Sequence, residues 1–296
     1  MAPLKISGER TFAMSVDVED YLHAWALSPA IKREDWSAWP SRVEAATMRI
    51  IDLFDRQQIK GTFFVLGWVA KRAPLLVREI IARGHELASH GFHHDKVHEL
   101  SPTDFREDVR ATRLLLEDLS GVAVQGFRAP SFSINDCCWW AYDQLREAGY
   151  RYSSSVHPIA HDHYGMPTAP LAPFRPTDSD LIEIPVATIE VLGRRVSCAG
   201  GGHFRLFPYR WSKWCLGRLA RENERTGAFY FHPWEIDPGQ PRVQGLPLRS
   251  KFRHYTGLGA MERKLKRLFS DFRWDRMDRL YGLSNAAPAA NSTASS

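Results

Sequence analysis

Short apolar runs alternate along the chain with longer amphipathic segments. The runs end abruptly in polar residues, which is typical of buried strands that lead into loops. The amphipathic segments have apolar residues at helical spacing, and two of them close on Gly84 and Gly121. Ser41 and Glu44 have the spacing of a capping box at the start of another helix. The pattern predicts strands at 11–16, 60–67, 85–91, 124–130, 150–156, 181–193 and 227–236, and helices at 41–58, 73–84, 101–121 and 136–149.

Strands that alternate with helices of about a dozen residues favour parallel βαβ units. Because polar residues recur at the strand ends, we expect an α/β fold of the distorted (β/α) barrel type, with the functional site at the carboxyl ends of the strands. We expect the barrel to span 11–237 and a basic, aromatic extension at 238–282 to pack on it. The small, polar tail at 283–296 is expected to be disordered.

The charge of the 296-residue chain is uneven. Its net charge is +5, and ten Lys and Arg against four Asp and Glu give 249–280 alone a charge of +6. The rest is close to neutral, which gives no reason to expect nucleic-acid binding. The basic segment 249–279 could contact an anionic membrane surface, although a helix packed on the barrel explains the same pattern. Its apolar residues are Leu265, Leu268, Phe269, Phe272 and Trp274.

The sequence also bears on location. No stretch approaches about 18 uninterrupted apolar residues, and the first residues lack the apolar core of a signal peptide. The four cysteines form no Cys-x-x-Cys pair, which favours a reducing compartment. We therefore expect a cytoplasmic protein, with the inner face of the membrane as an alternative. The oligomeric state is left open.

Five of the twelve histidines fall within 84–100. His90 and His94 have a spacing that can place two imidazoles on one metal ion, although most such pairs are surface histidines. We expect His85 to support the loop from behind, and His93 and His98 to be surface or loop residues.

Three acids, Asp17, Glu19 and Asp20, follow the first predicted strand. Two histidines and one carboxylate form the usual ligand set of a catalytic zinc or similar ion, with one position left for water. A further carboxylate nearby would take the proton from that water. Both Asp17 and Glu19 qualify for either role, and a solvated acidic loop is the alternative.

Two later residues complete a possible catalytic set. Arg128 ends a predicted strand, where it could hold a carboxylate in its ionised form. His232 follows an aromatic strand and could protonate a leaving amine. A surface arginine and a hydrogen-bonded core histidine are the respective alternatives.

These pieces occur in one order: Asp-x-Glu, GTFFVLG, HELASHGFHH, FRAPS, YSSSV and FHPWE. Over residues 11–237 the chain resembles the polysaccharide deacetylase family, carbohydrate esterase family 4, also called the NodB-homology domain. The stretches SVDVEDYLHAW, GGGHFRLFPY and FYFHPWEIDPGQPR resemble the sub-branch that accompanies exosortase (PEP-CTERM) exopolysaccharide clusters. Members of that sub-branch carry an extra C-terminal region.

The resemblance implies a role for each matching residue. Asp17 resembles the catalytic base of the family, and Arg128 resembles the arginine that tethers it. His90 and His94 resemble the metal histidines, and His232 resembles the catalytic acid. The backbone N–H of Ser131 lies where the family forms its oxyanion hole. The substrate-contacting residues that we expect are Pro130, Phe132 and Trp234.

Three positions depart from the common family pattern. Val18 separates the first two acids, so the metal carboxylate is expected to be Glu19, with Asp20 as the fallback. Ser153 stands where many members have an aspartate, which weakens a charge pairing behind the site. Ser131 replaces a usual tyrosine, which can change a wall of the sugar pocket.

The sequence therefore predicts a metal-dependent deacetylase, with Zn²⁺ as the expected ion. It would hydrolyse N-acetyl groups of an amino-sugar exopolysaccharide or its precursor, a carbon–nitrogen bond that is not a peptide bond. Two alternatives stay open: a hydrolase of small cyclic amides or imides on the same fold, and a non-catalytic carbohydrate-binding or scaffold protein.

Overall fold

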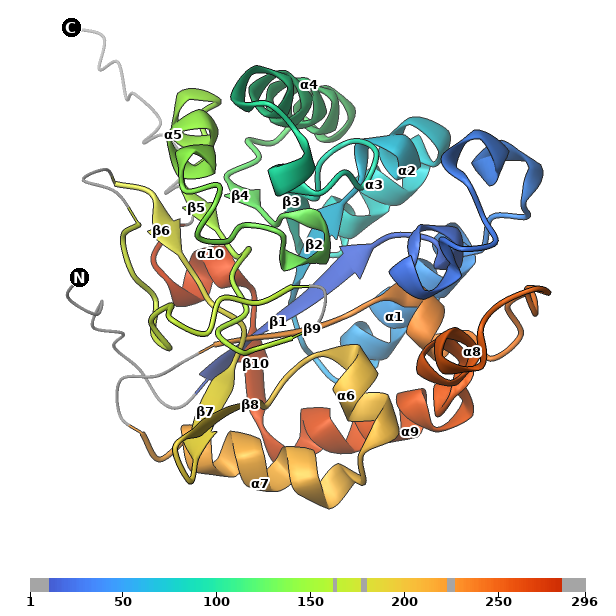
Figure 1. The fold of residues 1–296 in the computed structure, drawn as a ribbon, viewed down its shortest axis with the longest axis vertical. Coiled ribbons are helices and arrows are strands. Elements are labelled where there is room, and N and C mark those ends of the chain that lie inside the picture. The colour runs from blue at the N-terminus through green and yellow to red at the C-terminus, as the bar shows by residue number, and fades with distance from the viewer. Residues whose placement is uncertain (1–10, 162–163, 177–179, 223–226, 284–296) are drawn as a thin grey trace, which may run out of the picture.

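The computed structural model describes residues 11–161, 164–176, 180–222 and 227–283. Within these ranges one curled sheet has the strand order β10-β1-β2-β3-β4-β5-β6 (Figure 1). Strand β9 is off this path and pairs with the edge of β1 opposite β2. All of its ladders are parallel. The strands are β1 (Thr11–Val18), β2 (Thr62–Val65), β3 (Glu86–Ser89), β4 (Gly126–Phe127), β5 (Tyr152–Ser153), β6 (Ile182–Glu183), β9 (Ala228–Phe231) and β10 (Arg273–Asp275).

A single bridge brings the far end of the sheet back to its beginning. Beyond β6, Val186 pairs with Ala228, and the N–H of Ala187 donates to the carbonyl of Ala228 at 3.1 Å. Strand β9 therefore lies between β1 and the segment that follows β6. This arrangement confirms the predicted α/β fold of the distorted (β/α) barrel type.

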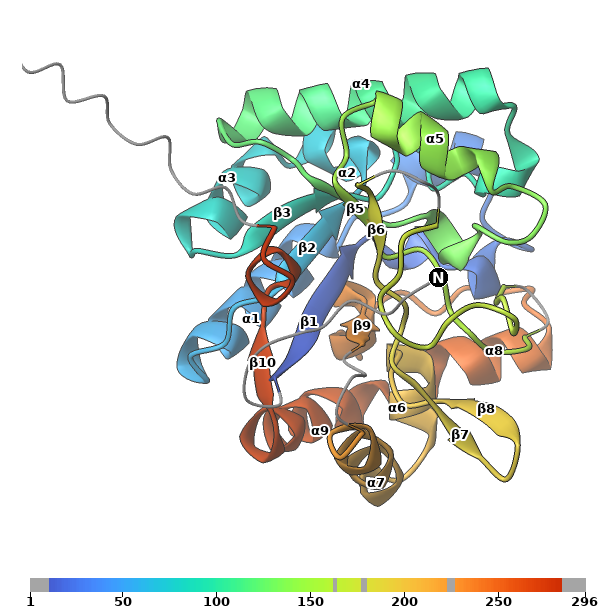
Figure 2. The same cartoon turned by 90° about the vertical axis from the view of Figure 1, so that its left-hand side faces the viewer.

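Helices cover the outside of the sheet, with α4 and α5 on one side and α7 and α9 on the opposite side (Figure 2). An antiparallel hairpin, β7 (Thr188–Val191) with β8 (Arg194–Ser197), stands apart from the sheet. No helix among the described residues is both long and apolar enough to cross a bilayer. The helices are α1 (Val43–Arg56), α2 (Gly67–Arg72), α3 (Pro74–Ala82), α4 (Pro102–Ser120), α5 (Trp140–Glu147), α6 (Gly201–Leu206), α7 (Tyr209–Leu219), α8 (Leu248–Tyr255), α9 (Leu258–Asp271) and α10 (Met277–Leu280).

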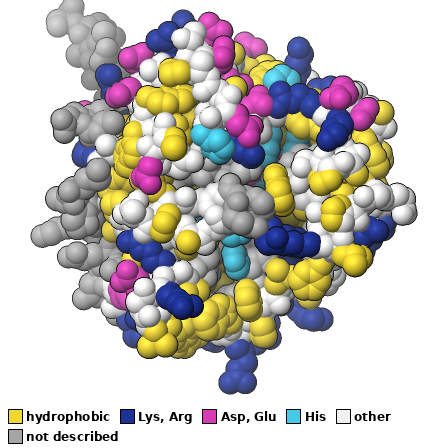
Figure 3. All heavy atoms as spheres, in the orientation of Figure 1, with side chains coloured by type: hydrophobic (Ala, Val, Ile, Leu, Met, Phe, Trp, Pro, Cys, Tyr) yellow, Lys and Arg dark blue, Asp and Glu magenta, His cyan; other side chains and the backbone are white. Residues whose placement is uncertain are grey.

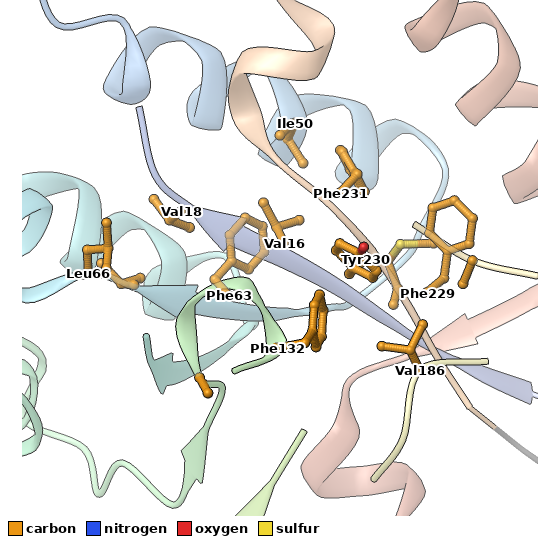
Figure 4. Packing of buried hydrophobic residues seen from close by; sticks show 14 of the residues in the cluster. Val16, Val18, Ile50, Phe63, Leu66, Phe132, Val186, Phe229, Tyr230 and Phe231 are labelled. Atoms are coloured by element: carbon orange, nitrogen blue, oxygen red, sulfur yellow. The ribbon is translucent and has the colours of Figure 1, made fainter. Parts of the chain in front are cut away.

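Alternation along β1 separates two sets of side chains. Val16 belongs to the layer between the sheet and the helices, together with Phe231 of β9 and Ile50 of α1 (Figure 4). Ala13 belongs to a separate cluster with Phe64, Tyr152 and Ala228, which fills the barrel. Because side chains alternate between the two faces of a strand, Ser15 and Asp17 share the inward row with Ala13. The pleat of β1 therefore carries Asp17 into the barrel mouth.

The helix ends test the predicted caps. Ser101 accepts a hydrogen bond from the N–H of Asp104 at 3.2 Å, and α4 stops at Gly121, whose φ is 72°. Gly84, with a φ of 76°, lies just beyond the end of α3. Both glycines adopt the left-handed conformation that terminates helices.

The capping box expected at Ser41 and Glu44 is wrong. Helix α1 begins at Val43, and its N-cap residue makes no side-chain cap bond. Ser41 instead donates its hydroxyl to Asp20 at 2.7 Å, and the same carboxylate oxygen accepts the N–H of Arg42 at 2.8 Å. A carboxylate from a distant segment therefore caps this helix.

The segment 238–282 contributes α8, α9, β10 and α10. Strand β10 pairs with Thr11–Ala13 of β1, so the end of the described chain adds a strand beside its beginning. Four of the five apolar residues noted in this segment, Leu265, Leu268, Phe269 and Trp274, are buried and so unavailable to a membrane. The tail expected to be disordered lies, from residue 284 on, outside the described residues.

Candidate active site

The carboxyl ends of β1, β3 and β9 meet at a cleft of about 430 Å³. Histidine side chains show at the centre of this face of the molecule (Figure 3). The cleft is lined by Asp17, Glu19, His90, His94, Ser131 and His232, among others. The first strand, the loop after β3, the segment after β4 and the segment after β9 thus contribute side chains to one space.

Glu19, His90 and His94 form a group that could hold a metal ion, because one ligand atom of each lies within 4.8 Å of the others. Nδ1 of His90 lies 2.8 Å from the carbonyl of Arg128, which fixes the tautomer that leaves Nε2 available as a ligand. Oε2 of Glu19 is buried and makes no hydrogen bond, although Nε2 of His94 lies 2.8 Å away. Two potential ligand atoms this close together suit adjacent ligands of one cation.

The charge states of these residues also suit a metal ion. Burial alone would raise the pKa of Glu19, but the nearby His94 and His232 lower it below its usual range. Burial lowers the pKa of His90 to about 4, so this imidazole is neutral near pH 7. Ionised carboxylates and neutral imidazoles are the forms that bind metals.

Asp20, the fallback for Glu19, does not belong to this group. Its Oδ1 accepts the N–H of Tyr21 at 2.9 Å, and its Oδ2 accepts Ser41 and Arg42. The carboxylate therefore caps two helical segments and is not directed at the two histidines.

Asp17 is held by a buried arginine. Oδ1 of Asp17 accepts from Nη1 of Arg128 at 2.6 Å, and both side chains are fully buried. The guanidinium also donates to Ser15 at 2.8 Å and to the hydroxyl and carbonyl of Ser154 at 2.8 and 2.9 Å, and it lies 4.1 Å from the ring centre of Phe64. Three polar contacts besides Asp17 orient Arg128, and Arg128 in turn orients Asp17.

The segment after β4 is strained where it borders the cleft. Ser131 has a φ of 55° and Phe132 a φ of 48°, which are uncommon values for residues other than glycine. Strain of this kind clusters at functional sites. Ser131 and Phe132 line the cleft, and Trp234 does so from the other side, whereas Pro130 is buried and is not one of the lining residues.

His232 lies opposite the metal-type group. Its Nε2 is 3.7 Å from Oε1 of Glu19 and 3.9 Å from Oδ2 of Asp17. Its Nδ1 is 3.1 Å from Oε2 of Glu235. Although burial would lower it, the pKa of His232 is raised to about 9 by Glu19, Glu235 and Asp17.

The sequence interpretation missed Glu235 and Arg205. Glu235 is fully buried, and its Oε1 accepts from Nε of Arg205 at 2.7 Å. Arg205 also donates to the carbonyls of Arg253 and His254 at 3.0 and 3.1 Å, which ties α6 to α8. The three-residue spacing between His232 and Glu235 could have revealed the glutamate, but no local signal marks its arginine partner.

A stack of rings extends the site beyond His232. Trp234 lies parallel to His232 at a centroid distance of 5.1 Å and to His254 at 4.5 Å. Nε1 of Trp234 donates to Oε1 of Glu19 at 3.1 Å. This tryptophan therefore connects the carboxylate of the metal-type group with the C-terminal segment.

Other histidines and Ser153 lie outside the reactive group. The expectation that His85 supports the metal loop is wrong, because His85 precedes β3, packs on Phe63 at 4.9 Å and lies at the opposite end of that strand. His93 is partly buried, and His98 lies 3.2 Å from the carbonyl of Ser133. Ser153 donates to Ser155 at 2.7 Å.

Family models match the chain in two consecutive parts. Residues 35–153 match the polysaccharide deacetylase family, and residues 154–282 match a domain family of unknown function, DUF3473. The first part contains His90, His94 and Arg128, and the second contains Arg205, His232 and Glu235. Asp17 and Glu19 precede both matches. The cleft is therefore assembled from both matched parts and from β1.

The relatives agree with this assignment. A peptidoglycan-N-acetylglucosamine deacetylase of Bacillus cereus is 29% identical over 99 residues, which cover 33% of this chain and 36% of that protein. A chitooligosaccharide deacetylase of Sinorhizobium fredii is 30% identical over 112 residues, which cover 38% of this chain and 49% of that protein. The chain thus spans less than half the length of these curated relatives.

A solved structure extends the likeness over the whole fold. A candidate polysaccharide deacetylase from Mycobacterium smegmatis superposes with a TM-score of 0.63 at 19% identity, covering 97% of this chain and 98% of that one. At this identity the likeness concerns the fold. The family match shows that residues 35–153 belong to a polysaccharide deacetylase domain, and the solved structure shows that the chain as a whole shares the fold of that protein.

Proposed function

We propose that the protein is a metal-dependent deacetylase that hydrolyses N-acetyl groups of an amino-sugar exopolysaccharide or of its precursor. One observation carries the proposal: a metal-type group, an arginine-held aspartate and a glutamate-held histidine face the same cleft. The names of the curated relatives support an acetylated amino-sugar substrate. The resemblance to exosortase-linked deacetylases supports an exopolysaccharide.

We propose that Glu19, His90 and His94 hold a divalent cation, Zn²⁺ in the first instance. Two imidazoles and one carboxylate are the ligand set of many catalytic zinc sites. The unpaired Oε2 of Glu19 and the available Nε2 of His90 fit such an ion. When bound, the ion supplies polarisation of the acyl oxygen and of water.

Asp17 is proposed as the general base. Arg128 fixes Oδ1 of this carboxylate, so Oδ2 is left to take a proton from the attacking water. Water adds to the acetyl carbon, and negative charge develops on the acyl oxygen. The N–H of Ser131, held at a strained φ, is proposed to donate to that oxygen.

His232 is proposed as the general acid. Its imidazolium would deliver a proton to the amine as the carbon–nitrogen bond breaks, which yields acetate and a free amino sugar. Its raised pKa supports this role, because the residue is protonated at neutral pH. A cation at Glu19 would offset part of the negative charge that raises this pKa, and so would bring it closer to neutrality.

The place of action is part of the same proposal. Buried, unpaired Cys138, Cys198 and Cys215 support a reducing compartment, and so action in the cytoplasm before export of the polymer.

Substrate contact is assigned to Phe132 and Trp234 at the cleft, with Pro130 shaping the segment from behind.

Acetate release from acetylated amino-sugar oligomers tests the proposal. Wild type and His90→Ala would be stripped with a chelator, reloaded with Zn²⁺ and offered chitin, peptidoglycan and exopolysaccharide fragments. We expect zinc-dependent acetate from wild type and a loss of about 10²-fold or more in the variant. Acetate from none of the oligomers, despite bound zinc, would contradict the substrate class and favour the small cyclic amides.

A further inference from the structure

The five exposed Trp and Phe side chains in the described ranges lie in the cleft or on helices α7 and α8. Monomeric proteins rarely gather such side chains in one place without a binding role. Phe207 and Trp25 line the cleft itself, and the others stand on α7 and α8 beside it. Their exposed fractions are 41% for Trp25, 46% for Phe207, 37% for Trp211, 43% for Trp214 and 60% for Phe252.

The ring of Phe207, just after α6, and the rings of Trp211 and Trp214 on α7 form a row. Phe207 belongs both to the cleft and to a shallow apolar hollow that Trp211 and Trp214 line. Centroid distances are 6.4 Å from Phe207 to Trp211 and 5.3 Å from Trp211 to Trp214. Cys215 and Leu216 anchor the opposite face of α7, so the indoles stay outside the core.

Helix α8 repeats this pattern on another side of the mouth. It packs beside the short helix that carries Trp25, and it buries Ser250 and His254. Leu248 and Phe252, one turn apart, are exposed. We call α7, α8, Trp25, Leu206 and Phe207 the rim.

The charge of the rim has one sign. Helices α7 and α8 contain three Lys or Arg each and no Asp or Glu. Asp271 lies 3.0 Å from Lys213, and Glu222 lies 3.6 Å from Arg218. Figure 3 shows apolar and basic side chains together on the part of this face where α6, α7 and α8 lie.

We propose that the rim docks on an anionic lipid surface, with the cleft opening toward the membrane. Exposed indole and phenyl rings beside Lys and Arg are the composition of interfacial helices, in which the rings enter the headgroup region and the cations pair with phosphates. The aliphatic Leu206 and Leu248 favour lipid over a sugar polymer, because sugars stack on rings. A saccharide carried on a lipid anchor would then reach the cleft without leaving the bilayer surface.

Vesicle co-sedimentation tests this proposal without reference to enzymatic activity. The full chain would be mixed with phosphatidylcholine vesicles, with and without phosphatidylglycerol, at low and high salt. We expect binding only to the anionic vesicles, weakened by salt. In Trp211→Ala/Trp214→Ala, binding should fall about tenfold or more, because two indoles no longer leave water.

Matched controls separate docking from general damage. Leu248→Ala on the rim should weaken binding, whereas Leu75→Ala, an exposed leucine on α3, should not. Equal binding to neutral vesicles, no binding at all, or equal effects of the two leucine variants would overturn the proposal. So would soluble oligosaccharides that quench the fluorescence of Trp211 and Trp214 without vesicle binding, or a dimer that the tryptophan variant dissociates.

Discussion

At the scale of single residues, Glu19 joins three parts of the cleft. Its Oε2 faces His94, and its Oε1 accepts from Trp234 and lies 3.7 Å from His232. Asp20, the next residue, faces away and caps helices. Two adjacent acids at the end of one strand therefore have different roles, one in the metal-type group and one as a helix cap. Substitution of each should affect a different property.

We predict that Glu19→Gln abolishes tight zinc binding, whereas Asp20→Asn retains it. The amide is a far weaker ligand than the carboxylate, and Asp20 has no part in the metal-type group. Metal content after dialysis against a weak chelator would measure the difference.

The two variants should differ in stability in the opposite sense, with Asp20→Asn the less stable of the two. Asp20→Asn weakens a charged cap that holds α1, and should lower the free energy of unfolding by about 1–2 kcal/mol in urea denaturation. Retained zinc in Glu19→Gln, with zinc lost in Asp20→Asn, would reverse the assignment of the metal carboxylate.

A second prediction concerns the residue behind His232. Glu235→Gln keeps a hydrogen-bond acceptor near Nδ1 but removes a negative charge that raises the pKa of His232. The alkaline limb of the pH profile of kcat should move to lower pH, by on the order of one unit. NMR titration of the imidazole measures the same shift without substrate.

A stability loss through Arg205 must be separated from the effect on His232, and Lys264→Met provides that control. Arg205 would be left buried without its carboxylate in Glu235→Gln, so some stability should be lost. Lys264 is a partly buried cation near Arg205 that has no contact with His232. In Lys264→Met, stability should fall but the alkaline limb of the pH profile should move little. An unmoved alkaline limb in Glu235→Gln would contradict the account of this histidine.

Motif spacing could predict much of the reactive group, because Asp17, His90, His94, Arg128 and His232 each follow a recognisable strand end. Spacing alone left Glu19 and Asp20 open, because adjacent side chains diverge according to the local turn, and only the family resemblance favoured Glu19. Spacing could not find Arg205 either, because this residue meets Glu235 only after α6 folds against the C-terminal segment.

At the scale of elements, the C-terminal segment is part of the barrel's packing. Helix α9 buries Leu265 completely, and β10 extends the sheet beside β1. Strand β10 is only three residues long and two of them, Arg273 and Asp275, are charged, so the sequence pattern did not reveal it. Its pairing is with a segment more than 250 residues away in the chain.

Two leucines of this segment test that integration. Leu265→Ala should lower the free energy of unfolding by about 2–5 kcal/mol, because it leaves a cavity in the core. Leu248→Ala, at 84% exposure on α8, should change it by less than about 0.5 kcal/mol. Urea midpoints measure both. Equal, small effects would mean that the segment contributes little to the fold.

At the scale of the whole molecule, the two ends of the barrel have opposite electrostatic designs. The cleft end favours the charged forms of Glu19 and His232, whereas the other end buries Glu86 beside Asp278. Burial, with Asp278, raises the pKa of Glu86 to about 7, although Thr62 and Tyr152 donate hydrogen bonds to it. The carboxyl is thus partly protonated at neutral pH.

This burial predicts a pH dependence of stability. The pKa of Glu86 is higher in the folded state than the usual 4.5, so its contribution is fully present below 4.5 and is lost as the pH rises through about 7. The loss should amount to about 3 kcal/mol at most, because each pKa unit of difference corresponds to about 1.4 kcal/mol. Thermal unfolding from pH 5 to 9 should show this decline in wild type and a flatter curve in Glu86→Gln. Parallel curves would refute it.

The overall architecture followed from the alternation of apolar runs and helices, because parallel strands need crossover helices. Closure through Val186 and Ala228 did not follow, since one bridge leaves no periodic signal. The rim on α7 and α8 was likewise hidden, because tertiary packing decides which rings of an aromatic-rich chain stay exposed.

A zinc titration tests the central claim most directly. Chelator-stripped protein would receive increasing Zn²⁺ while acetate release from an acetylated amino-sugar oligomer is recorded. The account predicts no acetate without metal and a linear rise that breaks at one equivalent, when Glu19, His90 and His94 are filled. Acetate release that is independent of zinc, or one bound equivalent with no acetate from any such oligomer, would contradict it.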